Sequence, residues 1–311
     1  MCDNLGYPKP RVLPVRSRTL VKTLAGRQRL TRLQLPRSRL CHLAFYAQRT
    51  PSLYVALPPP RSCLPCPVLQ ALKELRVSSL SEAAAFPASA VCQFSYLRSL
   101  TLDIKPDSQE GLLDCAQFGH LPHLESLTIS GWERVELGAQ VLLPALASIQ
   151  ADRLYSLEVS ARLPSLKSLE LSHVDFVGLA GEGLQLPQLT RLDLMAVCGE
   201  LAVSWSAMPQ LAELCFLEID EIGGLDIDTA GLAALTGLTF LCLEYCGTDS
   251  SSAGSNDILA AAPPSVVDLC LYGAREDWEE APPPLSCVTQ ITRLALDTTN
   301  LIPHLDPLKQ L

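Results

Sequence analysis

Apolar residues recur along the chain in a short motif. An apolar residue is followed by Pro, and then by apolar residues at the fourth, seventh and usually ninth places. Five consecutive segments align in this way without gaps: LPHLESLTI (121–129), LPALASIQA (143–151), LPSLKSLEL (163–171), LPQLTRLDL (186–194) and MPQLAELCF (208–216). The last two apolar residues lie two apart, so they point to one side of a short strand while their neighbours point to the other. The pattern predicts a series of short strands, each with one buried side.

The motif continues on both sides of this block. LQALKELRV (69–77), FSYLRSLTL (94–102), LTGLTFLCL (235–243), PPSVVDLCL (263–271) and VTQITRLAL (288–296) match it, RQRLTRLQL (27–35) matches in part and RTPSLYV (49–55) matches weakly. The seventh residue falls at 33, 53, 75, 100, 127, 149, 169, 192, 214, 241, 269 and 294, in steps of 20 to 28 residues. One such repeat cannot bury its apolar side alone, but stacked neighbours form a continuous core.

This motif and spacing resemble the leucine-rich-repeat family over residues 24–311. The resemblance implies an α/β fold, a curved horseshoe solenoid with a parallel concave sheet of about 12 short strands and irregular or helical convex connections. The Ala-, Pro- and Leu-heavy composition also looks like the irregular repeat sets of plants and green algae, some of which are associated with the ciliary axoneme. The resemblance therefore implies a cytoplasmic protein, with the cytoskeleton or the cilium axoneme as the narrower expectation.

Two features of the repeats depart from a regular pattern. Many family members place Asn or Cys three residues after the second strand Leu, where this chain has Cys246 once but otherwise Lys105, Trp132, Val174, Val197 and Ile219. Without that ladder we expect irregular loops after the strands. In addition, LYSLEV (154–159) fits the short motif as well as the segment before it does, so the register through 149–160 stays open.

Charge divides the chain into a basic arm and an acidic body. The first 50 residues hold 11 Lys and Arg against the single acid Asp3, and the other 261 hold 13 basic and 32 acidic residues. We assign 1–23 to a basic Pro/Arg-rich arm and 24–311 to the solenoid, whose last repeat, LIPHLDPLKQL (301–311), is unfinished. Such an arm could touch nucleic acid, an anionic surface or the body itself, or serve in organelle import. No secretory signal or membrane-spanning stretch is expected.

The residues that could carry catalysis form no recognised signature. The chain has no HExxH, GxSxG, Walker A or GxGxxG motif. Its five His are scattered, and His173 is expected at the C-terminal end of a concave strand without an identifiable nucleophile beside it. We predict a non-enzymatic protein with no cofactor and no metal.

The twelve Cys residues contain two noteworthy groups. Cys63 and Cys66 form a lone CxxC in a Pro-rich segment, which is typical of an ordinary loop and only secondarily of a metal or redox site. Cys215, Cys242 and Cys270 each lie between the two strand Leu of their repeats, so they should form a row on the concave face. Small residues on a binding surface and a soft-metal or oxidation site are both open interpretations of this row.

The concave positions themselves give the functional prediction. They are small and polar in the middle repeats, and they turn acidic and aromatic toward the C-terminus. A surface of that kind suits a partner protein with a basic, partly apolar surface. The candidate contact residues are Glu213, Phe240, Glu244, Tyr245, Asp268 and Tyr272.

The predicted function is therefore a non-catalytic protein-interaction scaffold. One alternative is substrate recognition in a ubiquitin ligase, a role such repeats often have behind an F-box, although no F-box-like segment precedes Leu33. The other is binding of nucleic acid or an anionic surface through the basic arm, with nucleic acid the less favoured partner.

Overall fold

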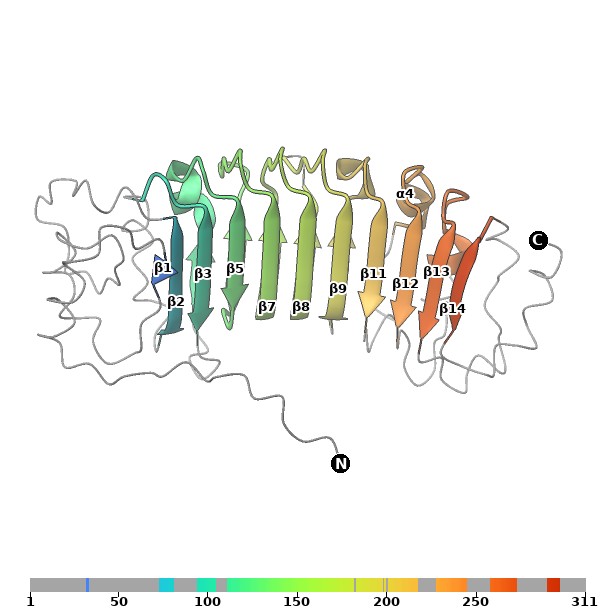
Figure 1. Ribbon diagram of the computed structural model, residues 1–311, viewed down its shortest axis with the longest axis horizontal. Coiled ribbons are helices and arrows are strands. Elements are labelled where there is room, and N and C mark those ends of the chain that lie inside the picture. The colour runs from blue at the N-terminus through green and yellow to red at the C-terminus, as the bar shows by residue number, and fades with distance from the viewer. Residues whose placement is uncertain are drawn as a thin grey trace, which may run out of the picture.

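The structure, a computed structural model, describes ten stretches of the chain. These are residues 32–33, 73–80, 94–104, 111–181, 183–197, 199, 201–217, 228–244, 258–272 and 290–296. Among them, eleven strands form one continuous parallel row, and Figure 1 shows them side by side. In order they are β1 (Arg32–Leu33), β2 (Glu74–Leu80), β3 (Ser99–Ile104), β5 (Ser126–Ser130), β7 (Ser148–Val159), β8 (Ser168–Leu179), β9 (Arg191–Val197), β11 (Glu213–Leu217), β12 (Phe240–Glu244), β13 (Asp268–Tyr272) and β14 (Arg293–Leu296).

The row has the register that the repeats predict. The markers at 75, 100, 127, 149, 169, 192, 214, 241, 269 and 294 are in register, each paired with the next. Leu33 of β1 pairs directly with Leu75 of β2, and the weak match at 49–55 lies outside the described residues. The parallel solenoid fold is confirmed, with eleven strands in the described row.

Each of the five best-matched repeats has Pro as its second residue, and the hydrogen bonds of the turn explain why. In Leu121-Pro122-His123-Leu124 the amide of Leu124 donates to the carbonyl of Leu121 at 3.2 Å. The same bond closes the turns that end at 146, 166, 189 and 211, at 3.1 to 3.3 Å. Proline thus occupies the second position of a β-turn, where its fixed φ is favourable and its missing N–H is not needed.

The connections on the other side of the central repeats are a second strip of parallel strands. Its members are β4 (Leu112–Asp114), β6 (Arg134–Leu137), the second halves of β7 and β8, and β10 (Leu201–Val203). The other described connections include the 3-10 helices η5 (Cys115–His120) and η6 (Trp205–Ala207) and the helix α4 (Thr229–Ala233). Irregular loops were therefore the wrong expectation for the central repeats.

The second strip also settles the register through 149–160. Ile149 pairs with Leu127 and Leu169 in the main row, whereas Leu157 pairs with Val135 and Val177 in the second strip. LYSLEV resembles a repeat strand because it is a strand with a buried side, but it belongs to the other strip.

The two strips are joined at residues with left-handed backbone. Gly131 (φ 75°), Arg153 (φ 53°), His173 (φ 54°) and Ala196 (φ 50°) occupy the same place in successive repeats, two residues after the second strand apolar residue. β7, β8 and β9 continue through this residue, whereas β5 ends at Ser130, just before it. The next residues, Trp132, Leu154, Val174 and Val197, are all buried. Apolar packing thus takes the place of the stacked Asn side chains that many leucine-rich repeats have at this position.

Two substitutions in opposite directions, Ala to Gly and Gly to Ala, test the left-handed backbone at this corner. Ala196→Gly is expected to raise the free energy of unfolding by up to about 1 kcal/mol, because a left-handed L-residue costs more than the added freedom of Gly in the unfolded chain. Gly131→Ala is expected to lower the free energy of unfolding by a similar amount. Urea denaturation measures both changes, and two changes of the same sign would contradict the assigned backbone.

The core lies between the two strips and is mainly aliphatic. Its buried residues form one cluster that runs from Leu75 to Leu271. The largest fully buried side chains are Trp132, Trp205, Phe118 and Phe216. Each repeat thus buries its apolar side only against its neighbours, and the outward positions of the main row remain free to face a ligand.

Candidate functional site

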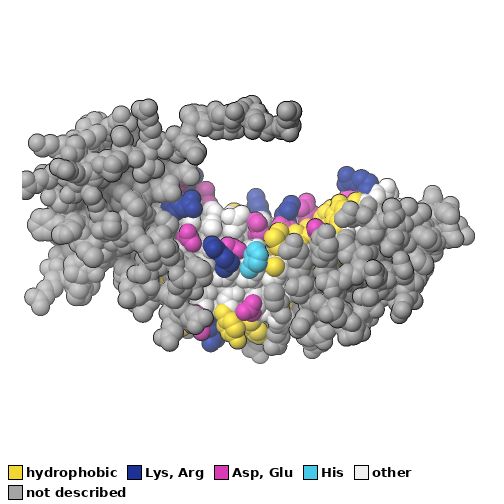
Figure 2. Space-filling view, turned by 90° about the horizontal axis from the view of Figure 1, so that it is seen from below, with side chains coloured by type: hydrophobic (Ala, Val, Ile, Leu, Met, Phe, Trp, Pro, Cys, Tyr) yellow, Lys and Arg dark blue, Asp and Glu magenta, His cyan; other side chains and the backbone are white. Residues whose placement is uncertain are grey.

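The outward side chains of the main row divide into two halves of different chemistry. From β3 to β8 they are mostly hydroxyl, amide and carboxylate groups. From β9 to β13 they include the apolar residues Met195, Leu217, Phe240 and Tyr272, all partly exposed, and three cysteines. Figure 2 shows hydrophobic side chains with acidic ones among them on the hollowed side, toward the C-terminal half. We call the second half the apolar–acidic patch.

The structure brings five of the six candidate contact residues together in this patch. Phe240 lies between its neighbours Glu213 on β11 and Asp268 on β13, and Glu244 pairs with Tyr272. Tyr245 lies outside the described residues. The clustering follows from register: Glu213, Phe240 and Asp268 share one outward position of adjacent strands, and Glu244 and Tyr272 share the outward position four residues later.

Three of the acids in the patch are already paired with two arginines. Arg191 Nη1 lies 3.1 Å from Glu213 Oε2, and Arg191 Nε donates to Asp193 Oδ2 at 2.7 Å. The Arg293 guanidinium donates two hydrogen bonds to the Asp268 carboxylate. These hydrogen bonds raise the pKa of Arg191 and of Arg293. The patch is therefore a mixed surface in which four carboxylates, at 193, 213, 244 and 268, face two guanidiniums.

Met195 and Leu217 belong to the patch although the sequence analysis did not select them. They pair with each other, and Leu217 also pairs with Glu244. Both follow the second inward residue of their strands. Extending the inward–outward alternation by one residue would have identified them.

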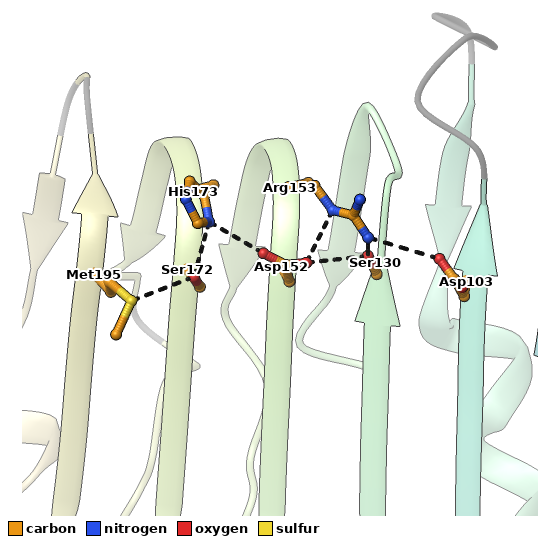
Figure 3. A network of polar contacts seen from close by, with 7 residues as sticks. All are labelled: Asp103, Ser130, Asp152, Arg153, Ser172, His173 and Met195. Atoms are coloured by element: carbon orange, nitrogen blue, oxygen red, sulfur yellow. Dashed lines mark hydrogen bonds and ion pairs between the residues drawn. The ribbon is translucent and has the colours of Figure 1, made fainter. Parts of the chain in front are cut away.

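A network of polar side chains lies along the edge of the main row where the corners to the second strip begin, and Figure 3 shows it in detail. Arg153 donates to Asp152 Oδ2 and to Ser130 Oγ, each at 2.9 Å, and its Nη2 lies 3.9 Å from Asp103. His173 Nδ1 lies 3.2 Å from Asp152 Oδ1. Arg153 and His173 are the left-handed residues of β7 and β8, and their side chains reach across to neighbouring strands. The network therefore links β3, β5, β7 and β8.

Ser172, His173 and Asp152 include the residue types of a hydrolytic triad, but not its geometry. The Ser172 hydroxyl lies 2.9 Å from His173 Nδ1, so a hydroxyl does lie beside this His, contrary to the sequence expectation. Asp152 approaches the same nitrogen. A triad needs the carboxylate on one ring nitrogen and the nucleophile on the other. The cluster thus orders the edge, and the non-enzymatic interpretation stays a prediction.

The three concave cysteines form the predicted row. Cys215 pairs with Cys242, which pairs with Cys270, and Cys215 pairs with Asp193 on its other side. Their side chains are 7% exposed, 6% exposed and partly exposed, respectively. The hydrogen bond with Cys215 lowers the pKa of Cys242, and the same contact together with burial raises the pKa of Cys215.

The repeats, the shared register of their strands and the proline turns decide the fold. The chain is a parallel β-solenoid with the fold of leucine-rich repeats. No family model matches the sequence, and no curated protein matches it. Solved structures of similar shape include a chain of the mouse RP105/MD-1 complex (TM-score 0.43, 18% identity, 73% of this chain and 34% of that chain) and human 5T4 (0.41, 20%, 68% and 78%). A leucine-rich-repeat protein of Leptospira interrogans is a third (0.22, 13%, 89% and 99%).

These likenesses concern the fold alone. The solenoid spans about a third of the RP105/MD-1 chain that it matches. Among the residues that the structure describes, no helix is long and apolar enough to cross a membrane, and no three His, Cys, Asp or Glu side chains are arranged around a common metal position. The basic arm (1–23), Cys63 and Cys66 lie outside the described part of the solenoid. The cytoplasmic or axonemal location stays a prediction.

Proposed function

We propose that the solenoid is a scaffold that binds a partner protein on its concave face, through the apolar–acidic patch on β9–β13. The observation that carries the proposal is the change of the outward positions from entirely polar or charged on β3–β8 to partly apolar on β9–β13. Neighbouring strands of one sheet have the same shape, so folding does not require this change. Apolar groups gathered on one part of a surface are typical of an interaction site.

Phe240 is the proposed anchor of the interface. It lies in the row between Glu213 and Asp268, and the arginine pairs hold both acids in place. An aromatic side chain surrounded by ordered polar groups is the usual arrangement of a binding hot spot. Because the strands are preformed, little conformational entropy is lost when a partner docks.

The proposed partner carries positive charge near an apolar group. With four carboxylates against two guanidiniums, the patch keeps an excess of negative charge after its internal pairs are counted. Complementary charge favours encounter and register more than affinity. The described residues give no observation in favour of the ubiquitin-ligase or the nucleic-acid alternative.

The test is Phe240→Ala in an affinity capture followed by titration of the captured protein. Loss of a hot-spot aromatic costs 2 kcal/mol or more, so we expect binding to weaken by roughly 30-fold or more. Tyr155→Ala is the matched control, because it truncates an aromatic side chain, 62% exposed, at the second strip. Reversing the charge of Glu213 or Asp268 would be a less decisive test, because it would also remove the ion-pair partner of Arg191 or Arg293.

A partner that binds Phe240→Ala as tightly as wild type would contradict the patch assignment. If the same partner were lost with Tyr155→Ala, the interface would lie on the opposite side of the solenoid.

A further inference from the structure

The cysteine row offers chemistry that a protein-docking surface does not need. Cys215, Cys242 and Cys270 stand in register on three adjacent parallel strands, Cys215 paired with Cys242 and Cys242 with Cys270. Sulfur donors of this kind select soft cations such as copper(I). The row is therefore a line of soft ligands rather than three isolated thiols.

A buried carboxylate closes one end of the row. Asp193 is 8% exposed, and its Oδ1 is buried without a hydrogen-bond partner among the described residues. Its neighbour in register is Cys215, whose thiol interacts with this carboxylate. An oxygen that has lost its water and gained no donor is costly, and positive charge beside Cys215 would offset part of that cost without a bond to the oxygen.

The charges around the row favour a cation over oxidation chemistry. Reactive, oxidation-prone cysteines lie in electropositive surroundings that stabilise the thiolate. Here the carboxylates outnumber the guanidiniums by four to two. Such surroundings do not supply the positive charge that oxidation chemistry at a cysteine relies on.

The spacing of the row limits how many thiols can reach one ion. In-register residues on adjacent strands are about 4.8 Å apart, so the two end thiols lie roughly twice that distance from each other. Three thiols cannot surround one ion in this arrangement. Two metal–sulfur bonds of about 2.3 Å placed in line span about 4.6 Å, which matches one strand spacing. Neighbouring pairs suit two-coordinate binding.

We propose that the row binds a monovalent thiophilic cation of the copper(I) class between two neighbouring thiolates, with Cys242 shared by both possible pairs. Each ion displaces two thiol protons and forms two metal–sulfur bonds, with no change of oxidation state. The protein then carries one more negative charge, which the guanidiniums of Arg191 and Arg293 help to offset. The thiol row lies within the apolar–acidic patch, but the proposed metal binding does not require the proposed partner.

The experiment is an anaerobic titration of copper(I) held by the chromophoric chelator bicinchoninate. All chains carry Cys63→Ser and Cys66→Ser, because that pair would compete for the metal. In this background we compare Cys215→Ser, Cys242→Ser, Cys270→Ser and the double variant Cys215→Ser/Cys270→Ser. Thermal melting by circular dichroism checks that each variant folds, and Cys242→Ala replaces Cys242→Ser if the latter melts early.

The shared middle thiol predicts a distinctive pattern. Loss of a residue that only supports a metal ligand costs roughly 10- to 100-fold in metal affinity. Cys242→Ser and the double variant remove a ligand from every pair, so we expect their copper affinity to fall by more than this. Either end variant keeps one intact pair and should bind within a few-fold of the parent. Unchanged binding by Cys242→Ser would overturn the site, and equal loss in all three single variants would overturn two-coordinate binding. Phe240→Ala should leave copper affinity unchanged, so the two proposals can fail separately.

Discussion

Replacing Leu192 with Asp is expected to unfold the solenoid. Leu192 has no exposed surface, and it pairs with Leu169 and Leu214 in the middle of the main row. The substitution removes the burial of a Leu side chain and places a carboxylate where the inward neighbours are apolar. The combined cost is about 5 kcal/mol or more, comparable to the whole stability of many domains.

Thermal and urea denaturation measure this effect. Gln188→Asp is the matched control, because it adds the same charge four residues earlier at an exposed position of the proline turn. The control is expected to stay within about 0.5 kcal/mol of wild type. Equal melting of Leu192→Asp and wild type would mean that this side chain does not face the core.

Trp132→Ala is the second change with a large expected effect. Trp132 is 2% exposed and occupies the slot after the left-handed corner, where many of the leucine-rich repeats that this sequence resembles have Asn or Cys. Removing a buried Trp side chain leaves a cavity that the rigid strips cannot close, so the free energy of unfolding should fall by about 3 to 5 kcal/mol. Tyr155→Ala, at an exposed aromatic residue, should cost far less.

Urea denaturation of both variants tests whether apolar packing replaces the Asn ladder. If Trp132→Ala were no less stable than Tyr155→Ala, the slot would contribute nothing to the core. The corner would then depend on backbone geometry alone.

The sequence predicts the main row well because one physical rule sets it. Alternation with a period of two places Leu192 inward and Cys215, Phe240 and Asp268 outward, and the repeat length aligns neighbours. The same rule, extended by one residue, reaches Leu217 and Met195. The Arg191–Glu213 pair also follows from aligned positions, so it was within reach of the sequence analysis.

The second strip and its corners were beyond that rule. LYSLEV has the same apolar spacing as the repeat strands, and spacing alone does not tell which strip a strand joins. A glycine repeated at this position would have indicated the left-handed corner in the sequence. Three of the four positions instead hold Arg153, His173 and Ala196. Packing of the residues that follow outweighs the local preference at these positions, which no short-range pattern reveals.

Continuation of β7 and β8 through the corner affects the order in which the molecule opens. These two strands pair along both strips, from Ser148 with Ser168 to Glu158 with Gly178, so theirs is the most extensive interface between neighbouring repeats. In a linear array each repeat is stabilised mainly by its neighbours, and unfolding proceeds from the weakest interfaces. Unfolding is thus expected to start at the outer repeats and to reach β7 and β8 last. The proposed partner and thiol sites lie on β9–β13, to the C-terminal side of this most stable pair. Local opening could expose the thiols or loosen the docking surface while the middle of the solenoid stays folded.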